Sequence, residues 1–255
     1  MISKNRLKQI QSLAYKKYRD RGGLFLAEGP KVVEELLAAY PPAYVAATEE
    51  WLDAHPLPGV ETEVVTSEEL RRASLMQTPQ HVLALLRKPQ GDTDTLPSGN
   101  DVSKNLVLAL DNIQDPGNLG TIVRICNWFG IGHIVCSPDT ADVYAPKVIQ
   151  ATMGALAKVK VHYTPLAGYL RQLPADTPVY GTFLEGSNIY TEALTPGGIV
   201  VMGNEGKGVS PEVAACINRR LFIPPFPTTA SHVESLNVAI ATAITVSEFR
   251  HRLHL

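Results

Sequence analysis

The sequence predicts an α/β protein whose C-terminal part is built on a mostly parallel sheet and is preceded by a small α/β N-terminal domain. Short apolar segments typical of strands alternate with helical segments along most of the chain. The C-terminal strand segments are short and mostly apolar, as expected for strands that helices cover on both faces. A stretch at 87–105, rich in Pro, Gly, Asp and Ser, separates the two parts.

The chain has 255 residues, enough for one large or two modest domains, with 45% hydrophobic and 19% charged residues. The polar, basic N-terminus predicts no signal peptide, and no apolar run approaches the length of a membrane span. Three widely spaced cysteines suit a reducing compartment, and scattered histidines predict no metal site. We therefore predict a cytoplasmic protein with neither a membrane segment nor a metal.

The N-terminal domain is predicted to span 1–88. An amphipathic helix opens it, because Leu7, Ile10, Ala14 and Tyr18 recur at helical spacing. The strand-like and helical segments that follow are LFLAEG, PKVVEELLAAY, AYVAAT, TEVVTS, SEELRRAS and HVLALLRK. They predict a small α/β unit.

The first 21 residues are strongly basic. They carry a single acid, Asp20, and a local excess of six positive charges from Lys4, Arg6, Lys8, Lys16, Lys17, Arg19 and Arg21. A basic segment on a slightly acidic protein favours a polyanion as partner. The alternative is an ordinary solvated helix face, and charge alone does not separate the two.

We place a linker at 89–105 and a second domain at 106–255. Strands are predicted at 106–110, 133–136, 159–163, 179–184 and 198–203, with a further short strand from 221. Helices are predicted at 119–129, 146–157, 211–219 and 234–252. Ligands of such sheets bind in the loops at the carboxyl ends of the strands, so these loops are the candidate site.

The first such loop lies in 110–130. Asp115 begins an Asp-Pro-Gly turn, and Asn118 is predicted to cap the following helix. Arg124 stands six residues further on, between two apolar residues. It is either a functional cation or a surface arginine paired with a nearby acid.

The second loop follows the strand at 198–203 and contains Gly203, Asn204, Glu205 and Gly206. It is not a P-loop, because Gly208 occupies the position of the hydroxyl that would bind magnesium. A dinucleotide fingerprint is also absent after 106–110. What remains is a tight turn with exposed amides and one acid, Glu205. This glutamate is either a functional residue, a helix cap or part of a solvated turn.

The third loop lies in 221–249, where Ile223 and Pro224 end a short strand. Ser235, Leu236 and Asn237 then open a long helix, which Ser235 or Asn237 could cap. That helix is apolar nearly all round, so it is either fully buried or pressed against another helix, including one of a second subunit.

Together these loops form an ordered series: Asn-x5-Arg, Gly-Asn-Glu-Gly, then Ile-Pro and Ser-Leu-Asn. The series resembles the three motifs of the SpoU branch of the SPOUT RNA methyltransferases over 106–252, and APKVIQATMGAL at 145–156 fits the same pattern. The N-terminal half resembles the L30e/L7Ae-like substrate-binding extension of ribosomal RNA 2′-O-methyltransferases. It agrees with the basic excess.

The resemblance implies a deep trefoil knot that binds S-adenosylmethionine and forms a homodimer. The residues it assigns to the cofactor are Gly203, Asn204, Glu205, Gly206, Ile223, Pro224, Ser235, Leu236 and Asn237. Those it assigns to catalysis are Asn118, Arg124, Glu205, Ser235 and Asn237. The glycines would let the backbone approach the adenosyl group. The loop at 224–234, which includes His232, is longer than in many relatives and leaves the contacts there open.

In this interpretation Glu205 holds Arg124 or a substrate group by a charge-assisted hydrogen bond. Arg124 serves either as a base or as a fixed cation that stabilises the developing alkoxide. The predicted activity is methyl transfer to a ribose 2′-hydroxyl of ribosomal RNA. The alternatives are a transfer RNA methyltransferase and a non-catalytic RNA-binding protein of the same fold. A nucleotide-binding oxidoreductase is disfavoured because its fingerprint is absent.

Overall fold

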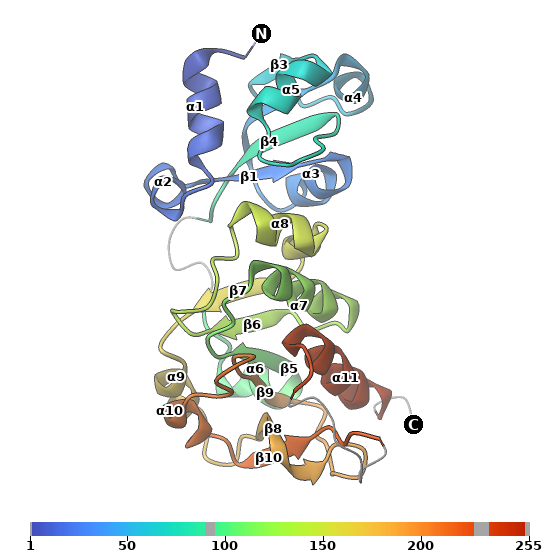
Figure 1. Cartoon of the computed structure of the whole chain (residues 1–255). Coiled ribbons are helices and arrows are strands. Elements are labelled where there is room, and N and C mark those ends of the chain that lie inside the picture. The colour runs from blue at the N-terminus through green and yellow to red at the C-terminus, as the bar shows by residue number, and fades with distance from the viewer. Residues whose placement is uncertain (1, 90–94, 227–234, 253–255) are drawn as a thin grey trace. The chain divides into compact units, whose positions relative to one another are not determined.

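The computed structural model describes residues 2–89, 95–226 and 235–252 and consists of two compact units. Unit 1 comprises Met1–Thr93 and Asp142–Lys158, and unit 2 comprises Asp94–Ala141 and Val159–Leu255. The chain therefore enters unit 1 a second time, with a segment from the middle of the predicted second domain. Figure 1 labels the elements of both units.

Unit 1 is built on a four-stranded sheet in the order β1-β4-β2-β3. Strand β4 is antiparallel to β1 and to β2, whereas β3 is parallel to β2. The strands are β1 (Leu24–Glu28), β2 (Pro42–Ala47), β3 (Thr62–Val64) and β4 (Val82–Arg87). The helices of the N-terminal part are α1 (Lys4–Ser12), α2 (Lys16–Gly22), α3 (Pro30–Leu37), α4 (Glu49–Ala54) and α5 (Ser67–Ala73).

Both faces of this sheet are covered, because successive side chains of β1 point to opposite sides. Leu24 and Leu26 join a core with residues of α1 and α5. Phe25 faces the other way and meets the rings of Tyr40 and Tyr144, with centroids 5.1 and 5.0 Å away. Tyr144 belongs to the second segment of unit 1, so that segment completes the second face.

The opening helix is two helices, α1 and α2, and not the single helix that the apolar spacing predicts. Arg19 is buried and donates hydrogen bonds to the carbonyl oxygens of Leu13 and Ala14, at 2.7 and 2.9 Å, where the helix is interrupted. Its guanidinium also pairs with Asp142, at 2.7 Å. The break is thus stabilised by a partner 123 residues away, which periodicity cannot reveal.

The second segment of unit 1 contains α8 (Pro146–Thr152) and a short 3-10 turn, η1 (Ala155–Ala157). The Gln150 side chain donates a 2.8 Å hydrogen bond to the Glu28 carbonyl of β1. The predicted helix at 146–157 is broken at Met153 and Gly154, which both have left-handed φ. A Cβ on Gly154 would lie 2.5 Å from the Cβ of Glu35, so close packing on α3 requires glycine there.

Unit 2 is built on a six-stranded sheet in the order β10-β8-β9-β5-β6-β7, with every neighbouring pair parallel. The strands are β5 (Leu106–Leu110), β6 (His133–Cys136), β7 (Lys160–Tyr163), β8 (Val179–Asn188), β9 (Gly198–Met202) and β10 (Arg219–Phe222). The predicted α/β class with a mostly parallel sheet is confirmed. The knot implied by the resemblance remains a prediction.

Helices cover both faces of this sheet. One core cluster combines β-strand residues with α6 (Gly99–Lys104), α9 (Leu166–Gln172) and α10 (Pro211–Ala214). On the opposite face, Phe249 of α11 (Val238–His251) packs edge-to-face on Tyr180 of β8, with centroids 4.9 Å apart. Helix α7 (Pro116–Trp128) packs beside α11 (Figure 1).

Helix α6 lies inside the stretch predicted as a linker. Ser98 and Asp101 form a capping box at its start, and Val102 is fully buried in the unit 2 core. Among the helices of the described ranges, none is long and apolar enough to cross a membrane.

Candidate active site

The candidate site lies where two neighbouring strands of unit 2 end. β5 and β9 are parallel and in register, with Leu110 opposite Met202, so the loops that follow leave the same edge of the sheet. The Asp111 amide donates to the Met202 carbonyl at 2.9 Å, and the buried Asp111 carboxylate accepts the Ser210 amide at 2.7 Å. These bonds tie the first predicted loop to the second.

The second loop is a tight turn organised by Asn204. The backbones of Asn204 and Gly208 exchange two hydrogen bonds, of 3.0 and 2.8 Å. The Asn204 side-chain oxygen accepts the amides of Gly206 and Lys207, each at 3.0 Å, and its nitrogen donates to the Asn112 carbonyl at 2.8 Å. Asn204 therefore holds the turn closed and anchors it to the first loop.

The three glycines of this turn serve different purposes. A Cβ on Gly203 would lie 2.4 Å from the Val209 amide nitrogen, so the turn's own backbone requires glycine there. Gly208 has a φ of +69°, which favours glycine. Gly206 has neither constraint, since the nearest atom to its Cβ position is the Asn204 side-chain oxygen at 3.7 Å. Gly206 and Gly208 therefore both face open space, and of these two only Gly206 is free of a left-handed φ.

The cap of α7 differs from the prediction. Asp115, and not Asn118, is the N-cap, and its carboxylate accepts the Asn118 amide at 2.7 Å. Because Asp115 satisfies the helix end, the Asn118 side chain is available for the neighbouring loops.

Three of the predicted site residues meet in one hydrogen-bonded chain. The Asn118 side-chain nitrogen donates to the Glu205 carboxylate at 2.5 Å. The Asn118 side-chain oxygen in turn accepts the side-chain nitrogen of Asn237 at 2.9 Å. Asn237 also caps α11, accepting the amides of Ala239 and Ile240. Residues from all three predicted loops are thus joined around a partly buried carboxylate.

Arg124 lies elsewhere on α7. It stands six positions after Asn118, which places it about 120° around the helix axis and about 9 Å along it. Its side chain is exposed, and within the described residues it has no hydrogen-bond or ion-pair partner. The expectation that Glu205 holds Arg124 is not met, because Glu205 is bonded to Asn118 instead.

Within the described residues, the remaining predicted cofactor residues do not take part in this hydrogen-bonded chain. Ile223 and Pro224 are partly buried after β10, and Leu236 is exposed before α11. Ser235 is exposed and does not cap the helix. Most of the loop at 224–234, whose cofactor contacts the sequence left open, lies outside the described residues, as does His232.

Sequence reasoning did not single out Asn112, which stands two residues after β5. It has a left-handed φ of 61°, and its side-chain oxygen is buried without a hydrogen-bond partner among the described atoms. Its position as a polar residue just beyond an apolar strand could have identified it from the sequence.

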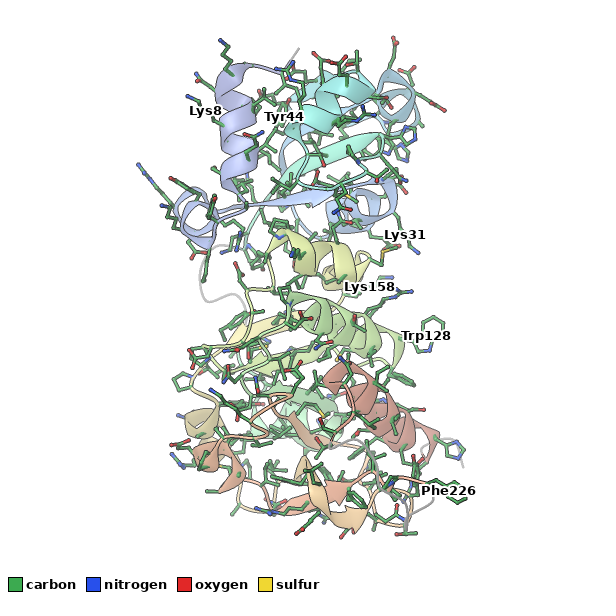
Figure 2. The ribbon with its side chains drawn as sticks, in the orientation of Figure 1. Lys8, Lys31, Tyr44, Trp128, Lys158 and Phe226 are labelled. Atoms are coloured by element: carbon green, nitrogen blue, oxygen red, sulfur yellow. The ribbon has the colours of Figure 1, made fainter. Side chains whose placement is uncertain are left out.

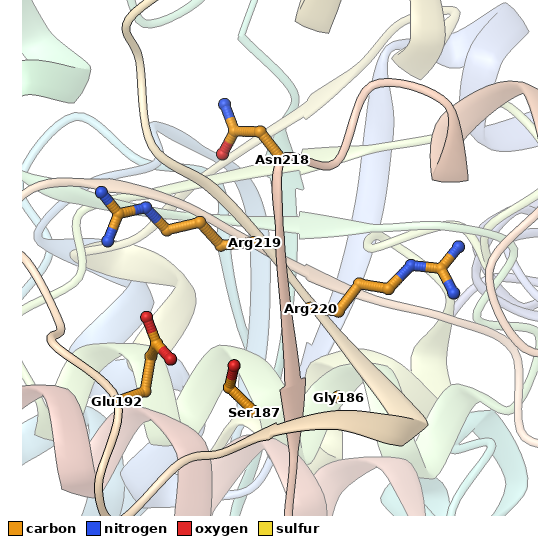
Figure 3. A pocket seen from close by; sticks show the side chains of 6 residues that line it. All are labelled: Gly186, Ser187, Glu192, Asn218, Arg219 and Arg220. Carbon is orange, nitrogen blue, oxygen red and sulfur yellow. The ribbon is translucent and has the colours of Figure 1, made fainter.

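A cavity of about 380 Å³ lies at β8 and β10 and not at this edge (Figure 3). Its lining is polar and charged, and it shares no residue with the predicted site: Gly186, Ser187, Glu192, Asn218, Arg219 and Arg220. The Arg219 guanidinium is already bonded to the Ala193 carbonyl at 3.2 Å. The cavity therefore offers little apolar surface for an adenine ring.

The predicted RNA-binding residues of unit 1 are not equivalent. Arg19 is buried in its pair with Asp142, so it does not belong to an exposed basic surface. Arg6 stacks on Tyr44 at 4.1 Å and pairs with Glu61. Lys16 pairs with Asp20 at 3.2 Å. Among these seven predicted residues, those that are exposed and have no ion-pair partner in the described chain are Lys4, Lys8, Lys17 and Arg21. Figure 2 shows Lys8 extending away from α1.

Groups of three or more side chains that could hold a metal ion are absent from the described ranges. The side chains described above supply amides, one carboxylate and an exposed guanidinium. Such groups orient a bound molecule and stabilise charge on it.

Comparison with protein families assigns both parts of the chain. The SpoU rRNA Methylase family matches residues 105–247, and the MRM3-like substrate binding domain matches residues 4–84. The 23S rRNA (guanosine(2553)-2′-O)-methyltransferase RlmP of Bacillus subtilis is 29% identical over 251 residues, which cover 96% of each chain.

Solved structures show the same similarity. A TrmH-family protein from Porphyromonas gingivalis superposes with a TM-score of 0.86 at 42% identity, covering 99% of each chain. An AdoMet-bound rRNA methyltransferase from Sinorhizobium meliloti gives a TM-score of 0.83 at 27% identity, covering 99% of this chain and 97% of the other.

Proposed function

The chain belongs to the SpoU rRNA methylase family, and from that membership we propose that it transfers a methyl group from S-adenosylmethionine to a ribose 2′-hydroxyl of ribosomal RNA. The observation that carries this proposal is the bonded chain of Glu205, Asn118 and Asn237. It joins the three loops whose sequence defines the resemblance. A protein that only binds RNA has no need for a carboxylate held by the Asn118 amide, which a second amide, that of Asn237, holds in turn.

The residues of the second and third loops fit the cofactor. Gly206 leaves open space over a turn whose backbone amides and carbonyls are close to the surface. Ile223, Pro224 and Leu236 supply apolar surface of the kind that an adenine ring prefers. When bound, S-adenosylmethionine supplies an electrophilic methyl group on a good leaving group.

The protein must then align the ribose hydroxyl and manage its proton. A guanidinium is a poor base because it holds its proton over the physiological range. We therefore assign Arg124 the role of a fixed cation that stabilises negative charge on the attacking oxygen. Glu205, oriented by Asn118, is positioned to accept a hydrogen bond from the substrate or cofactor.

A homodimer is part of this proposal. Trp128 at the end of α7 is 84% exposed, and Ile240 of α11 is 55% exposed. Figure 2 shows Trp128 extending away from the fold. Because α7 packs beside α11, these apolar side chains suit burial against a second copy, with two-fold symmetry as the default. Light scattering at micromolar concentration should give twice the chain mass; a monomer would contradict this part of the proposal.

Ribosomal RNA is favoured over transfer RNA by the MRM3-like substrate binding domain at 4–84. We place the enzyme in the cytoplasm.

The test of the proposed activity is incubation with radiolabelled S-adenosylmethionine and ribosomal RNA, followed by alkaline hydrolysis. One phosphodiester should become alkali-resistant, because a methylated 2′-oxygen cannot attack the neighbouring phosphate. A label on a base, or transfer to transfer RNA alone, would show the proposal to be wrong.

A further inference from the structure

We propose that Tyr15 and Tyr18 form a stacking surface for unpaired nucleotides of the RNA substrate, flanked by Lys17 and Arg21. This inference rests on the proposed function, because it names the form of RNA that unit 1 recognises. It adds aromatic side chains to a surface that charge alone had suggested.

The two tyrosines are exposed without a structural reason. Tyr15 is 64% exposed and Tyr18 is 40% exposed. Tyr15 is the N-cap residue of α2 but makes no side-chain capping bond. Their rings lie edge to face, with centroids 6.4 Å apart and planes at 71°. Two neighbouring aromatic rings left in water, one at the N-cap of α2 and one in its first turn, are typical of a binding surface.

The charges around the tyrosines select the partner. The Lys17 ammonium lies 4.8 Å from the centre of the Tyr18 ring. Lys17 and Arg21 are four residues apart on α2, so they lie on one face of the helix. Lys4 and Lys8 have the same spacing on α1, and all four cations are exposed. Aromatic rings combined with cations fit a nucleic acid better than an apolar protein surface.

The same combination favours single-stranded over double-stranded RNA. In an A-form duplex the bases are stacked inside, and proteins contact mainly phosphates and 2′-hydroxyl groups. Exposed rings gain nothing from such a duplex. Unpaired bases, in contrast, stack on aromatic side chains whatever their sequence.

The experiment measures RNA affinity of the full-length protein by fluorescence anisotropy. The probes are an unstructured oligouridylate of about 12 nucleotides, within the range of known single-strand sites, and an RNA duplex of the same length. The variants are Tyr15→Ala, Tyr18→Ala and Tyr18→Phe. Both alanine variants should weaken binding to the single strand by at least roughly fivefold. Binding to the duplex should not change, and phenylalanine should retain the affinity.

A salt series separates stacking from charge. The tyrosine variants should keep the wild-type slope of log affinity against log salt concentration, because they remove no phosphate contact. Lys17→Ala and Arg21→Ala should each reduce that slope by about 0.7. Tyr190→Ala is the matched control, because Tyr190 is a comparably exposed tyrosine (49%) outside the basic segment, and it should bind as wild type does.

Three results would overturn the inference: wild-type affinity of both alanine variants for the single strand, equal losses for strand and duplex, or an equal loss in Tyr190→Ala. If RNA affinity is unaffected while the tyrosine variants fail to bind another macromolecule, the surface belongs to a protein or membrane partner and the inference is also wrong. Methyl transfer at saturating RNA is measured in parallel. Its absence from the wild type would contradict the proposed function, whereas its presence with tyrosine-independent binding contradicts only the stacking surface.

Discussion

The Asn118 side chain donates a 2.5 Å hydrogen bond to the Glu205 carboxylate and so connects two loops that are 87 residues apart in the chain. The bond can form because Asp115 caps α7 through the Asn118 backbone amide and leaves the Asn118 side-chain amide free. It links the first and second predicted loops directly, side chain to side chain. We therefore expect Asn118 to act through Glu205 as a positioning residue.

A double-mutant cycle tests this coupling. Asn118→Ala and Glu205→Ala should each lower kcat/KM for methyl transfer by roughly ten- to 150-fold, the effect of losing a hydrogen bond to a charged group. The double variant should lose less than the product of the two, with a coupling free energy of about 0.5–3 kcal/mol. Asn127→Ala, an exposed amide on the same helix, is the control and should behave as wild type. Strictly additive losses would show that the bond does not matter to the reaction.

The turn glycines give a direct test of the cofactor site. Gly206→Phe should leave the melting temperature unchanged, because its Cβ position meets no atom closer than 3.7 Å. It should weaken binding of S-adenosylhomocysteine at least roughly tenfold, because a ring would fill the space that we assign to the ligand. Gly203→Ala should instead destabilise the protein, because its Cβ would lie 2.4 Å from the Val209 nitrogen. Calorimetry measures the affinity, and wild-type affinity in Gly206→Phe would exclude this turn from the site.

The structure could be predicted from the sequence wherever a single local signal determined it. The five strand predictions of unit 2 that have full ranges, such as 106–110 and 198–203, correspond to observed strands because each is a short and mostly apolar run. The parallel direction of the strands then followed from the helices predicted between most of them. The placement of the candidate loops at one edge needed only the rule that parallel strands end on the same side.

The sequence did not predict the structure correctly where long-range partners or competing capping residues determine it. The break between α1 and α2 depends on Arg19 and its distant partner Asp142. Asp115 and Asn118 are both good capping residues, and only the structure shows which one caps α7. Polar composition hid α6, although the Ser98 capping box that begins it is visible in the sequence.

Arg19 should prove structural and not a contact for RNA. Arg19→Met leaves the Asp142 carboxylate largely buried without its partner, so the free energy of unfolding should fall by about 3–5 kcal/mol. The salt dependence of RNA binding should not change. Lys17→Met is the matched variant and should show the reverse, with unchanged stability and a weaker salt dependence. Chemical denaturation measures the free energy of unfolding, and fluorescence anisotropy measures the salt dependence of RNA affinity. A weaker salt dependence in Arg19→Met would show that Arg19 contacts RNA after all.

Glu28 predicts a specific pH dependence of stability. Burial raises the pKa of this carboxyl above its ordinary value of 4.5, an effect only partly offset by hydrogen bonds from Ser74 and Leu75. The folded state therefore binds this proton more tightly than the unfolded chain, and the associated stability is lost as the pH rises through the folded pKa. Glu28→Gln removes the titration. The melting temperature of wild type relative to Glu28→Gln should fall between acidic and neutral pH, and a constant difference would contradict the shift.

The last prediction concerns the reaction. Arg124 is exposed and lies on a different face of α7 from Asn118, so Arg124→Ala should fold and bind S-adenosylhomocysteine and RNA as wild type does. Its kcat should fall at least roughly 100-fold, as for loss of a group that stabilises charge in the transition state. Lysine should restore little, because a point charge on a flexible stem does not reproduce a planar guanidinium. Arg171→Ala removes an exposed arginine from α9 and is the control. Single-turnover kinetics separate turnover from binding; a variant that keeps wild-type kcat would remove Arg124 from the catalytic residues.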